Sequence, residues 1–147
     1  MKNFIKLTFT VMTLAIFLGA CAKEGCTDGI ADNFCEDCKK DDGTCTYSAS
    51  LQFWYGQSTA TNLVTNGSTS LTYYIDNAIV GSSAASVYYT GDPDCATSGV
   101  VRQKKELGKE KSKAATYKIV DDLGDIIWSG SETFDANKSC TSIQLTY

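Results

Sequence analysis

The 147-residue chain contains no histidine and only one proline. Without histidine it lacks the side chain needed for Ser-His-Asp or Cys-His catalysis, for an imidazole metal site and for a histidine-based pH switch. Basic residues are also in the minority, 13 Lys and Arg against 17 Asp and Glu, so no basic surface indicates nucleic acid as a partner. The length and the 43% hydrophobic content suit one folded domain with a small appendage.

Residues 1–20 have the features of an export signal. Lys2 and Lys6 form a basic start, an apolar stretch follows from Leu7 to Leu18, and small residues precede Cys21. The stretch is shorter than the roughly 20 apolar residues that a permanent membrane-spanning helix requires. Removal of this signal takes two lysines and no acid from a chain with a formal net charge of −4, so the mature chain is more acidic still.

The end of this signal, LGAC at 18–21, resembles the lipobox of bacterial lipoproteins. The resemblance implies that the Cys21 thiol receives a diacylglyceryl group, that the chain is cleaved before Cys21, and that the new amino group is acylated. Several acyl chains anchor a protein almost permanently, because each buried methylene contributes about 0.8 kcal/mol. The implied location is the bacterial cell envelope, at the periplasmic or surface face of the outer membrane. An ordinary signal peptide that ends beside a cysteine is the alternative.

Residues 21–46 form an acidic, cysteine-rich segment with too few apolar residues for a core, so we expect disulfides to hold it together. Six cysteines remain once Cys21 is lipidated, an even number, as a set of disulfides in an oxidising compartment requires. Four lie in this segment and allow three pairings: Cys26, Cys35, Cys38 and Cys45. By elimination, Cys95 pairs with Cys140 in the body of the protein.

Three stretches of the segment resemble the short GCTD…DDGSC repeat of secreted and surface proteins of bacteria: GCTD at 25–28, AxNF at 31–34 and DDGTC at 41–45. That family pairs its two flanking cysteines, so the resemblance implies a Cys26–Cys45 disulfide. Cys35 and Cys38 depart from the family, whose middle usually contains no cysteine.

The acids of this segment raise calcium binding as a second hypothesis, and no other cofactor is predicted. Calcium takes six to eight oxygen ligands at about 2.4 Å. The candidate ligands are Asp28, Asp32, Asn33, Asp41 and Asp42. Against this hypothesis, the D-x-D-x-D-G spacing of a dedicated calcium loop is missing. Zinc held by the four cysteines is a further alternative, which an oxidising compartment disfavours.

Residues 47–147 are rich in Thr, Val, Ile, Tyr and Ser, with turn residues at short intervals, which is typical of an all-β protein. We predict a small antiparallel β-sandwich of about seven or eight strands, preceded by the disulfide-rich irregular segment and a cleaved signal helix. No helical periodicity persists after the signal. The predicted strands are 48–56, 69–76, 78–81, 84–90, 99–106, 114–121, 125–134 and 140–147.

Parts of this body resemble small prealbumin-like or PEGA-like β-sandwich domains of bacterial lipoproteins: YYIDNAIVG at 73–81, the WSG turn at 128–130 and the terminal strand CTSIQL at 140–145. Such domains are usually binding or spacer modules without catalysis. The resemblance therefore implies a non-enzymatic function.

Alternation along the strands singles out three aromatic residues. If their neighbours face the core, Trp54, Tyr74 and Tyr88 project outward. Three outward aromatic side chains would form a flat platform suited to stacking on sugar rings or peptide segments. The alternative is that they form cross-strand pairs that only stabilise the sheet. The same alternation predicts that Ile126 and Trp128 belong to the core.

No catalytic residues are predicted, because the neighbouring acids Asp121 and Asp122 have the composition of a turn. The favoured hypothesis is a non-enzymatic lipoprotein, anchored to the membrane by its lipid, that binds or spaces an extracellular polysaccharide or an envelope protein. The alternative is a small lipoprotein inhibitor of a foreign hydrolase, in which the loop 91–95 projects into the enzyme's cleft.

The lipid prediction is tested by labelling growing cells with radioactive palmitate. We expect label in the wild-type chain and none in Cys21→Ser, because only that thiol receives the diacylglyceryl group. Thiol titration of the purified mature protein should find no free sulfhydryl among the six remaining cysteines. Absence of label, or six reduced thiols, would refute the assignment.

Overall fold

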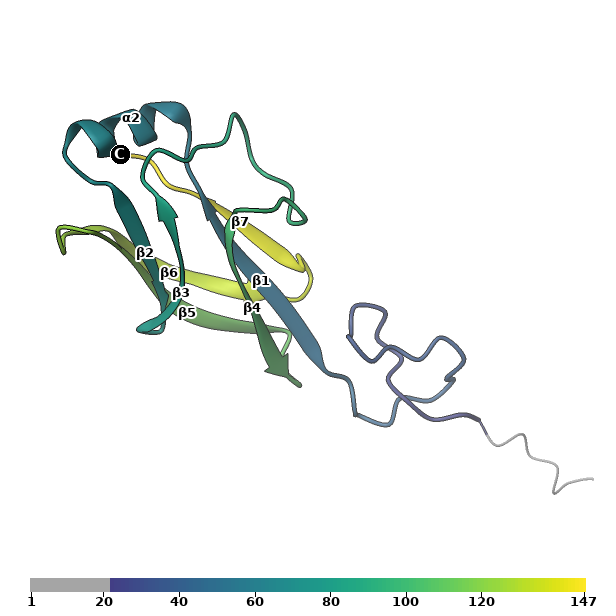
Figure 1. Cartoon of the computed structure of the whole chain (residues 1–147). Helices are drawn as coiled ribbons and strands as arrows, with labels where there is room; N and C mark the ends of the chain where they lie inside the picture. The colour runs from purple at the N-terminus through teal and green to yellow at the C-terminus, as the bar shows by residue number, and fades with distance from the viewer. Residues whose placement is uncertain (1–21) are drawn as a thin grey trace, which may run out of the picture.

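The computed structural model describes residues 22–147, so the predicted signal peptide and the predicted lipidation site Cys21 lie outside the described residues. Two sheets pack face to face, one of three strands in the order β4-β1-β7 and one of four in the order β3-β2-β5-β6 (Figure 1). The predicted all-β sandwich is thereby confirmed, with seven strands. The elements are β1 (Tyr47–Trp54), α2 (Gln57–Thr65), β2 (Ser70–Ile75), β3 (Ala78–Ala84), β4 (Val101–Gly108), β5 (Ser112–Asp121), β6 (Ile126–Asp135) and β7 (Cys140–Gln144).

The core lies between the two sheets and follows from strand alternation. Leu51 and Phe53 of β1 face Tyr73 of β2 and Ile119 of β5, and all four side chains are buried. The Phe53 and Tyr73 ring centroids lie 5.7 Å apart with tilted planes, an arrangement that aromatic pairs favour. Each large apolar side chain buried in this way contributes about 1.5–3 kcal/mol. The pairs within the sheets are antiparallel, except that β7 runs parallel to β1.

The predictions for the middle of the chain were wrong in two places. α2 was not predicted; it spans nine residues without a charged side chain and buries only Thr59, Ala60 and Leu63 against the end of the sandwich. So short a helix shows little periodicity, and its stability comes mainly from that tertiary packing. The predicted strand 84–90 is not a strand either, because β3 ends at Ala84 and the chain then leaves the sheet.

Residues 85–100, here called the strap, cross the outer face of the three-stranded sheet. The Cys95–Cys140 disulfide ties the strap to the start of β7, as predicted. The Gln52 amide of β1 donates to the Pro93 carbonyl at 2.6 Å, and the Ser142 hydroxyl donates to the Asp92 carboxylate. On the chain-entropy argument the disulfide contributes about 4 kcal/mol, because it closes a long loop. The strap is thus fastened along the sheet.

Residues 22–46, here called the knot, are irregular and carry the other two disulfides, Cys26–Cys45 and Cys35–Cys38. The residues alone left three pairings open, and the observed one agrees with the pairing that the repeat resemblance implied. The Cys26–Cys45 bridge spans 19 residues and contributes about 3 kcal/mol on the same entropy argument. Few side chains of the knot are buried, so its disulfides replace a hydrophobic core.

The knot joins the sandwich through a polar junction centred on Asp28. The Tyr47 hydroxyl at the start of β1 donates to the Asp28 carboxylate at 2.7 Å, and the Lys111 ammonium between β4 and β5 pairs with it at 2.6 Å. Beside this contact, the Ser48 hydroxyl donates to Asp32 at 2.8 Å. The knot is therefore fastened to two separate parts of the sandwich, and its orientation is defined by these contacts.

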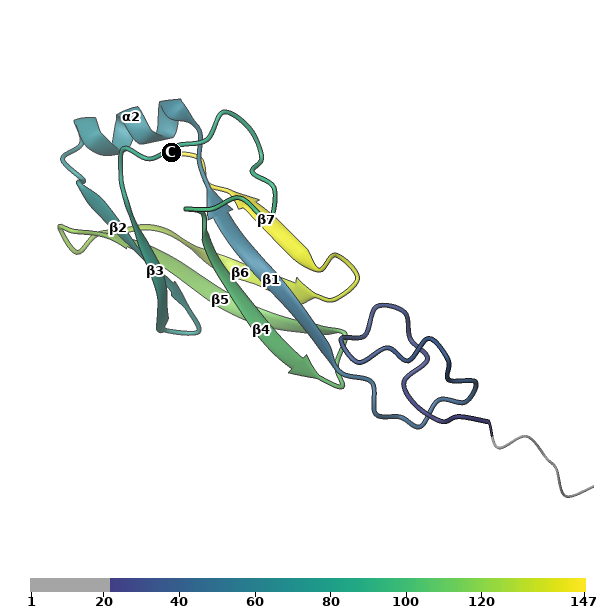
Figure 2. The same cartoon turned by 45° about the vertical axis from the view of Figure 1, so that its right-hand side comes forward.

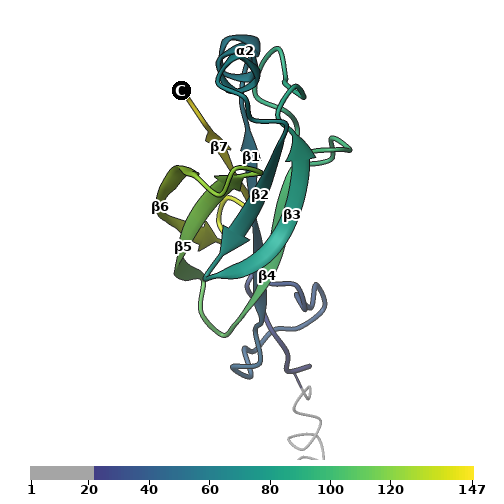
Figure 3. The ribbon, with the colours of Figure 1, turned by 60° about the vertical axis from the view of Figure 1, so that its left-hand side comes forward.

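The molecule is elongated along its strands. The knot and the start of the described chain lie at one end, and α2 and the C-terminus lie at the other (Figures 1 and 2). A view from the side shows α2 lying across the top of the sandwich, between the chain end and the strap (Figure 3). The end formed by α2, the β5–β6 turn, the adjoining start of β6 and the residues after β7 is here called the distal pole.

No helix among residues 22–147 has the length and apolar character needed to cross a membrane.

The Asp28 junction makes stability depend on pH. The hydrogen bond from Lys111, with those from Tyr47 and the Ile30 N–H, lowers the pKa of Asp28 from 3.8 to about 2. The folded state thus favours the carboxylate, and this stabilisation is complete above pH 3.8 and is lost as the pH falls through about 2.

We therefore expect Asp28→Asn to lower the melting temperature at pH 7, and the difference from wild type to vanish near pH 2. Circular dichroism melts at pH 7, 4 and 2 measure this. Asp37→Asn is the control and should melt like wild type, because the Asp37 carboxylate is 86% exposed and 3.8 Å from Lys23. Equal melting of wild type and Asp28→Asn at pH 7 would contradict the role given to the junction.

Candidate functional site

The predicted aromatic platform does not form. Trp54 is only 8% exposed. It lines a small internal gap together with Val87 and Tyr89 of the strap. Tyr74 lies on the other sheet, half-buried, with the Lys118 ammonium 4.9 Å from its ring centre. Tyr88 is exposed, but it stands in the strap and not in a strand. The expectation was wrong because the chain leaves the sheet after β3 and covers the outer face that holds Trp54.

The five calcium candidates are not brought together as ligands. Their side-chain oxygens accept hydrogen bonds inside the knot or across its junction with the sandwich. The partners are Lys111 and Tyr47 for Asp28, Ser48 for Asp32, Thr46 for Asn33, Gly43 for Asp41 and Thr44 for Asp42. Across residues 22–147, no group of three or more acidic or cysteine side chains is placed to hold a metal ion.

The neighbouring acids Asp121 and Asp122 have structural roles, in agreement with turn chemistry. Asp121 is buried and accepts from the backbone N–H groups of Leu123 and Asp125, which closes the β5–β6 turn. Asp122 accepts from the hydroxyl and N–H of Thr69 at the start of β2, and these bonds lower its pKa to about 2. Together they clamp the β5–β6 turn beside α2, and so they shape the distal pole.

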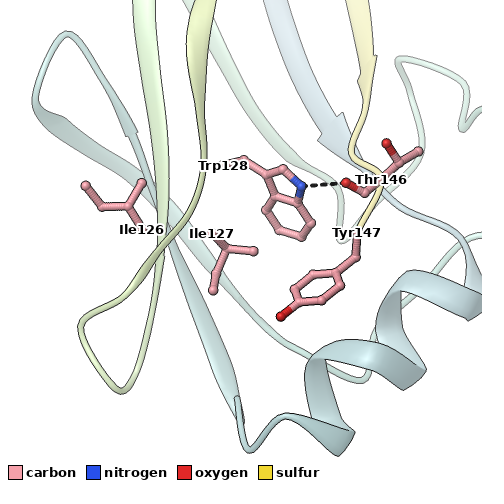
Figure 4. Close-up of a pocket in the computed structure, with 5 residues that line it drawn as sticks. All are labelled: Ile126, Ile127, Trp128, Thr146 and Tyr147. Carbon is pink, nitrogen blue, oxygen red and sulfur yellow. Dashed lines mark hydrogen bonds between the residues drawn. The ribbon is translucent and has the colours of Figure 1, made fainter.

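A surface hollow of ≈ 360 Å³ lies at the distal pole where β6 meets the chain end (Figure 4). We call it the aromatic hollow; it is lined by Ile126, Ile127, Trp128, Thr146 and Tyr147. The Trp128 indole N–H donates to the Thr146 carbonyl at 2.9 Å, as the dashed line in Figure 4 shows. The Trp128 ring stacks on Tyr55 at 6.0 Å and meets the Tyr147 ring edge-on at 6.4 Å. Packing thus fixes Trp128, whereas Tyr147 is 57% exposed.

A β-bulge in β6 produces this hollow. Ile119 pairs with Trp128, whereas Val120 pairs with Ile126, so Ile127 is an extra residue on β6. Because an extra residue reverses the alternation, Trp128 faces inward with Ile119 and Ile126 faces outward with Val120. Ile126 is 61% exposed, so its predicted place in the core was wrong. No turn residue marks the bulge, and strict alternation along the sequence therefore missed the hollow.

A second hollow of ≈ 260 Å³ lies between α2 and the strap, and we call it the α2 groove. Its apolar walls come from Ala60 and Val64 of α2 and from Tyr88 of the strap. The two hollows are linked across the end of α2, because the Asn66 side-chain amide donates to the Tyr147 hydroxyl at 2.8 Å. The distal pole is therefore one surface with a hollow on each side of the helix.

This pole gathers exposed apolar side chains, and the nearest cation is Lys118 of β5, which lines a neighbouring hollow together with Ile126. Six of the nine exposed large hydrophobic residues among the described residues lie on it or at its edge: Val64, Val87, Tyr88, Leu123, Ile126 and Tyr147. Its charged side chains are Asp122 and Asp125 at the surface, with Asp121 buried beneath them, and α2, residues 122–128 and residues 145–147 contain no Lys or Arg. Exposed apolar patches of this kind mark interaction sites.

Comparison of the chain with protein-family models, with curated proteins and with solved structures found no match. Function is therefore inferred from the distal pole and from the motifs of the sequence.

The two aromatic residues of the hollow should differ in their effect on stability. Trp128→Ala removes a ring that stacks on Tyr55 and closes the edge of the core, so we expect a loss of about 2–3 kcal/mol in the free energy of unfolding. Tyr147→Ala should cost less than about 0.5 kcal/mol, because most of that ring faces solvent. Urea unfolding followed by circular dichroism measures both. A costly Tyr147→Ala would show that the hollow is part of the core and not a free surface.

Proposed function

We propose that this protein is a non-enzymatic binding module of the bacterial cell envelope, held by lipids on Cys21, whose distal pole contacts a partner. The observation that carries the proposal is the concentration of exposed apolar side chains at the distal pole. This pole is the end of the molecule opposite the start of the described chain (Figure 1). A tether on Cys21 attaches beside the knot. The strands would then hold the distal pole away from the membrane, where a partner has access to it.

The disulfides support an extracytoplasmic location. All six cysteines of the described residues are paired, in three bridges that close loops of very different length. Disulfides persist in oxidising compartments and are rare in the cytosol. They agree with the lipobox-like LGAC at 18–21, since both support an extracytoplasmic mature chain.

The lining of the two hollows favours binding over catalysis. The aromatic hollow is lined by three apolar or aromatic side chains, a threonine and a tyrosine, and the α2 groove has no carboxylate, amine or thiol in its lining. The hydroxyl groups in these linings would need an adjacent base to act as nucleophiles, and neither lining supplies a carboxylate, amine or imidazole for that role. The nearest acids, Asp121 and Asp122, are engaged in the clamp of the β5–β6 turn.

The strap geometry separates this proposal from the inhibitor hypothesis. An inhibitor of that kind needs a loop that projects into a foreign cleft. The loop 91–95 is instead fastened to the sheet by Asp92, the Pro93 carbonyl and the Cys95 disulfide. The surface that is free to dock is the distal pole.

Site-specific photo-crosslinking in living cells tests the proposal. With benzoylphenylalanine at position 126 or 147, we expect adducts of higher mass after illumination, because both side chains face a bound partner. Position 79 at the β2–β3 hairpin is the matched control, since Ile79 is 67% exposed but lies away from the pole, and it should give none. A polysaccharide partner would be detected by binding of the purified chain to a glycan array, reduced by Ile126→Ser. Adducts that form equally at position 79, or none together with a blank array, would refute the proposal.

A further inference from the structure

We infer that the distal pole binds a protein segment that presents bulky apolar side chains beside lysine or arginine. This inference rests on the proposed binding function and names its partner. Three properties of the pole carry it: the sign of its charge, its two separate hollows, and the packing of its aromatic rings.

The negative charge of the pole indicates that the partner carries positive charge. Asp122 and Asp125 are exposed around the β5–β6 turn, and within residues 22–147 neither carboxylate forms an ion pair with a lysine or arginine. Two lysines farther from the pole are already paired, Lys111 with Asp28 of the knot and Lys105 of β4 with Asp76 of the β2–β3 turn. Like charges across an interface oppose association, so nucleic acid, anionic lipid and acidic polysaccharide are disfavoured. A cationic segment is favoured because it complements the exposed carboxylate of Asp125 and the negative charge of Asp122, whose oxygens also accept from Thr69.

The shape of the pole suits a segment with two anchors. The aromatic hollow and the α2 groove measure ≈ 360 and ≈ 260 Å³ and lie on opposite sides of α2. Each is near the lower end of the size of small-molecule pockets, which is roughly 300–1,000 Å³. A hollow of that size accepts one or two large side chains. A chain that crosses α2 would place an apolar side chain in each hollow and its basic groups beside the β5–β6 turn.

The aromatic rings of the pole do not offer the stacked faces that sugars require. Trp128 already stacks on Tyr55, and its indole N–H is bonded to the Thr146 carbonyl. The more exposed rings, Tyr88 and Tyr147, line different hollows and cannot sandwich one ring. These contacts favour a protein segment over a neutral polysaccharide.

A second copy of this chain is also disfavoured as the occupant. Pole-to-pole pairing would bring Asp122 and Asp125 of both copies together, and like charges oppose it. Two copies tethered through Cys21 in one membrane would also point their poles in the same direction, so the poles would not face each other.

Selection from a library of displayed random peptides tests the inference. The mature chain is immobilised at its N-terminal end, so that the pole faces solution, and a parallel selection uses the Ile126→Ser/Tyr147→Ser double variant. We expect wild type, but not the double variant, to enrich peptides with two bulky apolar residues and at least one Lys or Arg. Circular dichroism melts verify that each variant is folded.

The affinity of one enriched peptide is then measured by fluorescence anisotropy. We expect Ile126→Ser and Tyr147→Ser each to weaken binding about tenfold, and Asp125→Asn about threefold, with weaker binding at high salt. The matched controls Ile79→Ser and Asp37→Asn remove an equally exposed apolar group and an equal charge elsewhere, and should change affinity less than twofold.

Other results overturn the inference in distinguishable ways. Enriched peptides without basic residues, or equal binding by the pole variants and the controls, refute the stated partner. Failure to enrich any peptide, with glycan binding lost in Ile126→Ser, refutes a protein partner and leaves the binding function standing. Failure of peptides, glycans and crosslinks together refutes the binding function as well.

Discussion

The polar junction around Asp28 is the contact on which the arrangement of the molecule depends. The knot has almost no core, so its disulfides hold its internal shape but do not orient it. The Asp28 carboxylate does so, because it accepts from Tyr47 at the start of β1 and pairs with Lys111 beside β4 and β5. With the knot held at one end of the strands, a lipid on Cys21 would place α2 and the chain end farthest from the membrane. The proposed function follows from this polarity.

The strap decides which surface is free. Once the chain leaves the sheet after Ala84, it returns across the three-stranded sheet and is fastened there by Cys95 and by the buried Gln52. This covering removes Trp54 from solvent and fastens the loop 91–95 to the sheet. The strap therefore argues against two hypotheses at once. It covers the face on which an aromatic platform was expected, and it holds down the loop that an inhibitor would need to project. The exposed apolar groups that remain lie mostly at the distal pole.

A single extra residue in β6 creates the aromatic hollow. The bulge turns Ile126 outward and leaves Trp128 inward against Tyr55, so an apolar wall forms at the edge of the sandwich. The clamp of Asp121 and Asp122 holds the neighbouring turn beside α2. Both the binding proposal and the choice of a cationic apolar partner draw on these local features, because they place apolar side chains next to carboxylates that form no ion pair within residues 22–147.

The sequence by itself determined the all-β class, the regions of the seven observed strands and the pairing of Cys95 with Cys140, because alternation and cysteine parity are local or countable properties. It also determined that the knot needs disulfides, since the segment has too few apolar residues for a core. Only the tertiary structure decided the place of α2, the course of the strap, the bulge at Ile127 and the burial of Trp54. Each of these depends on which distant segments meet, as when the sandwich end stabilises a nine-residue helix of weak propensity, and no local pattern encodes such a meeting.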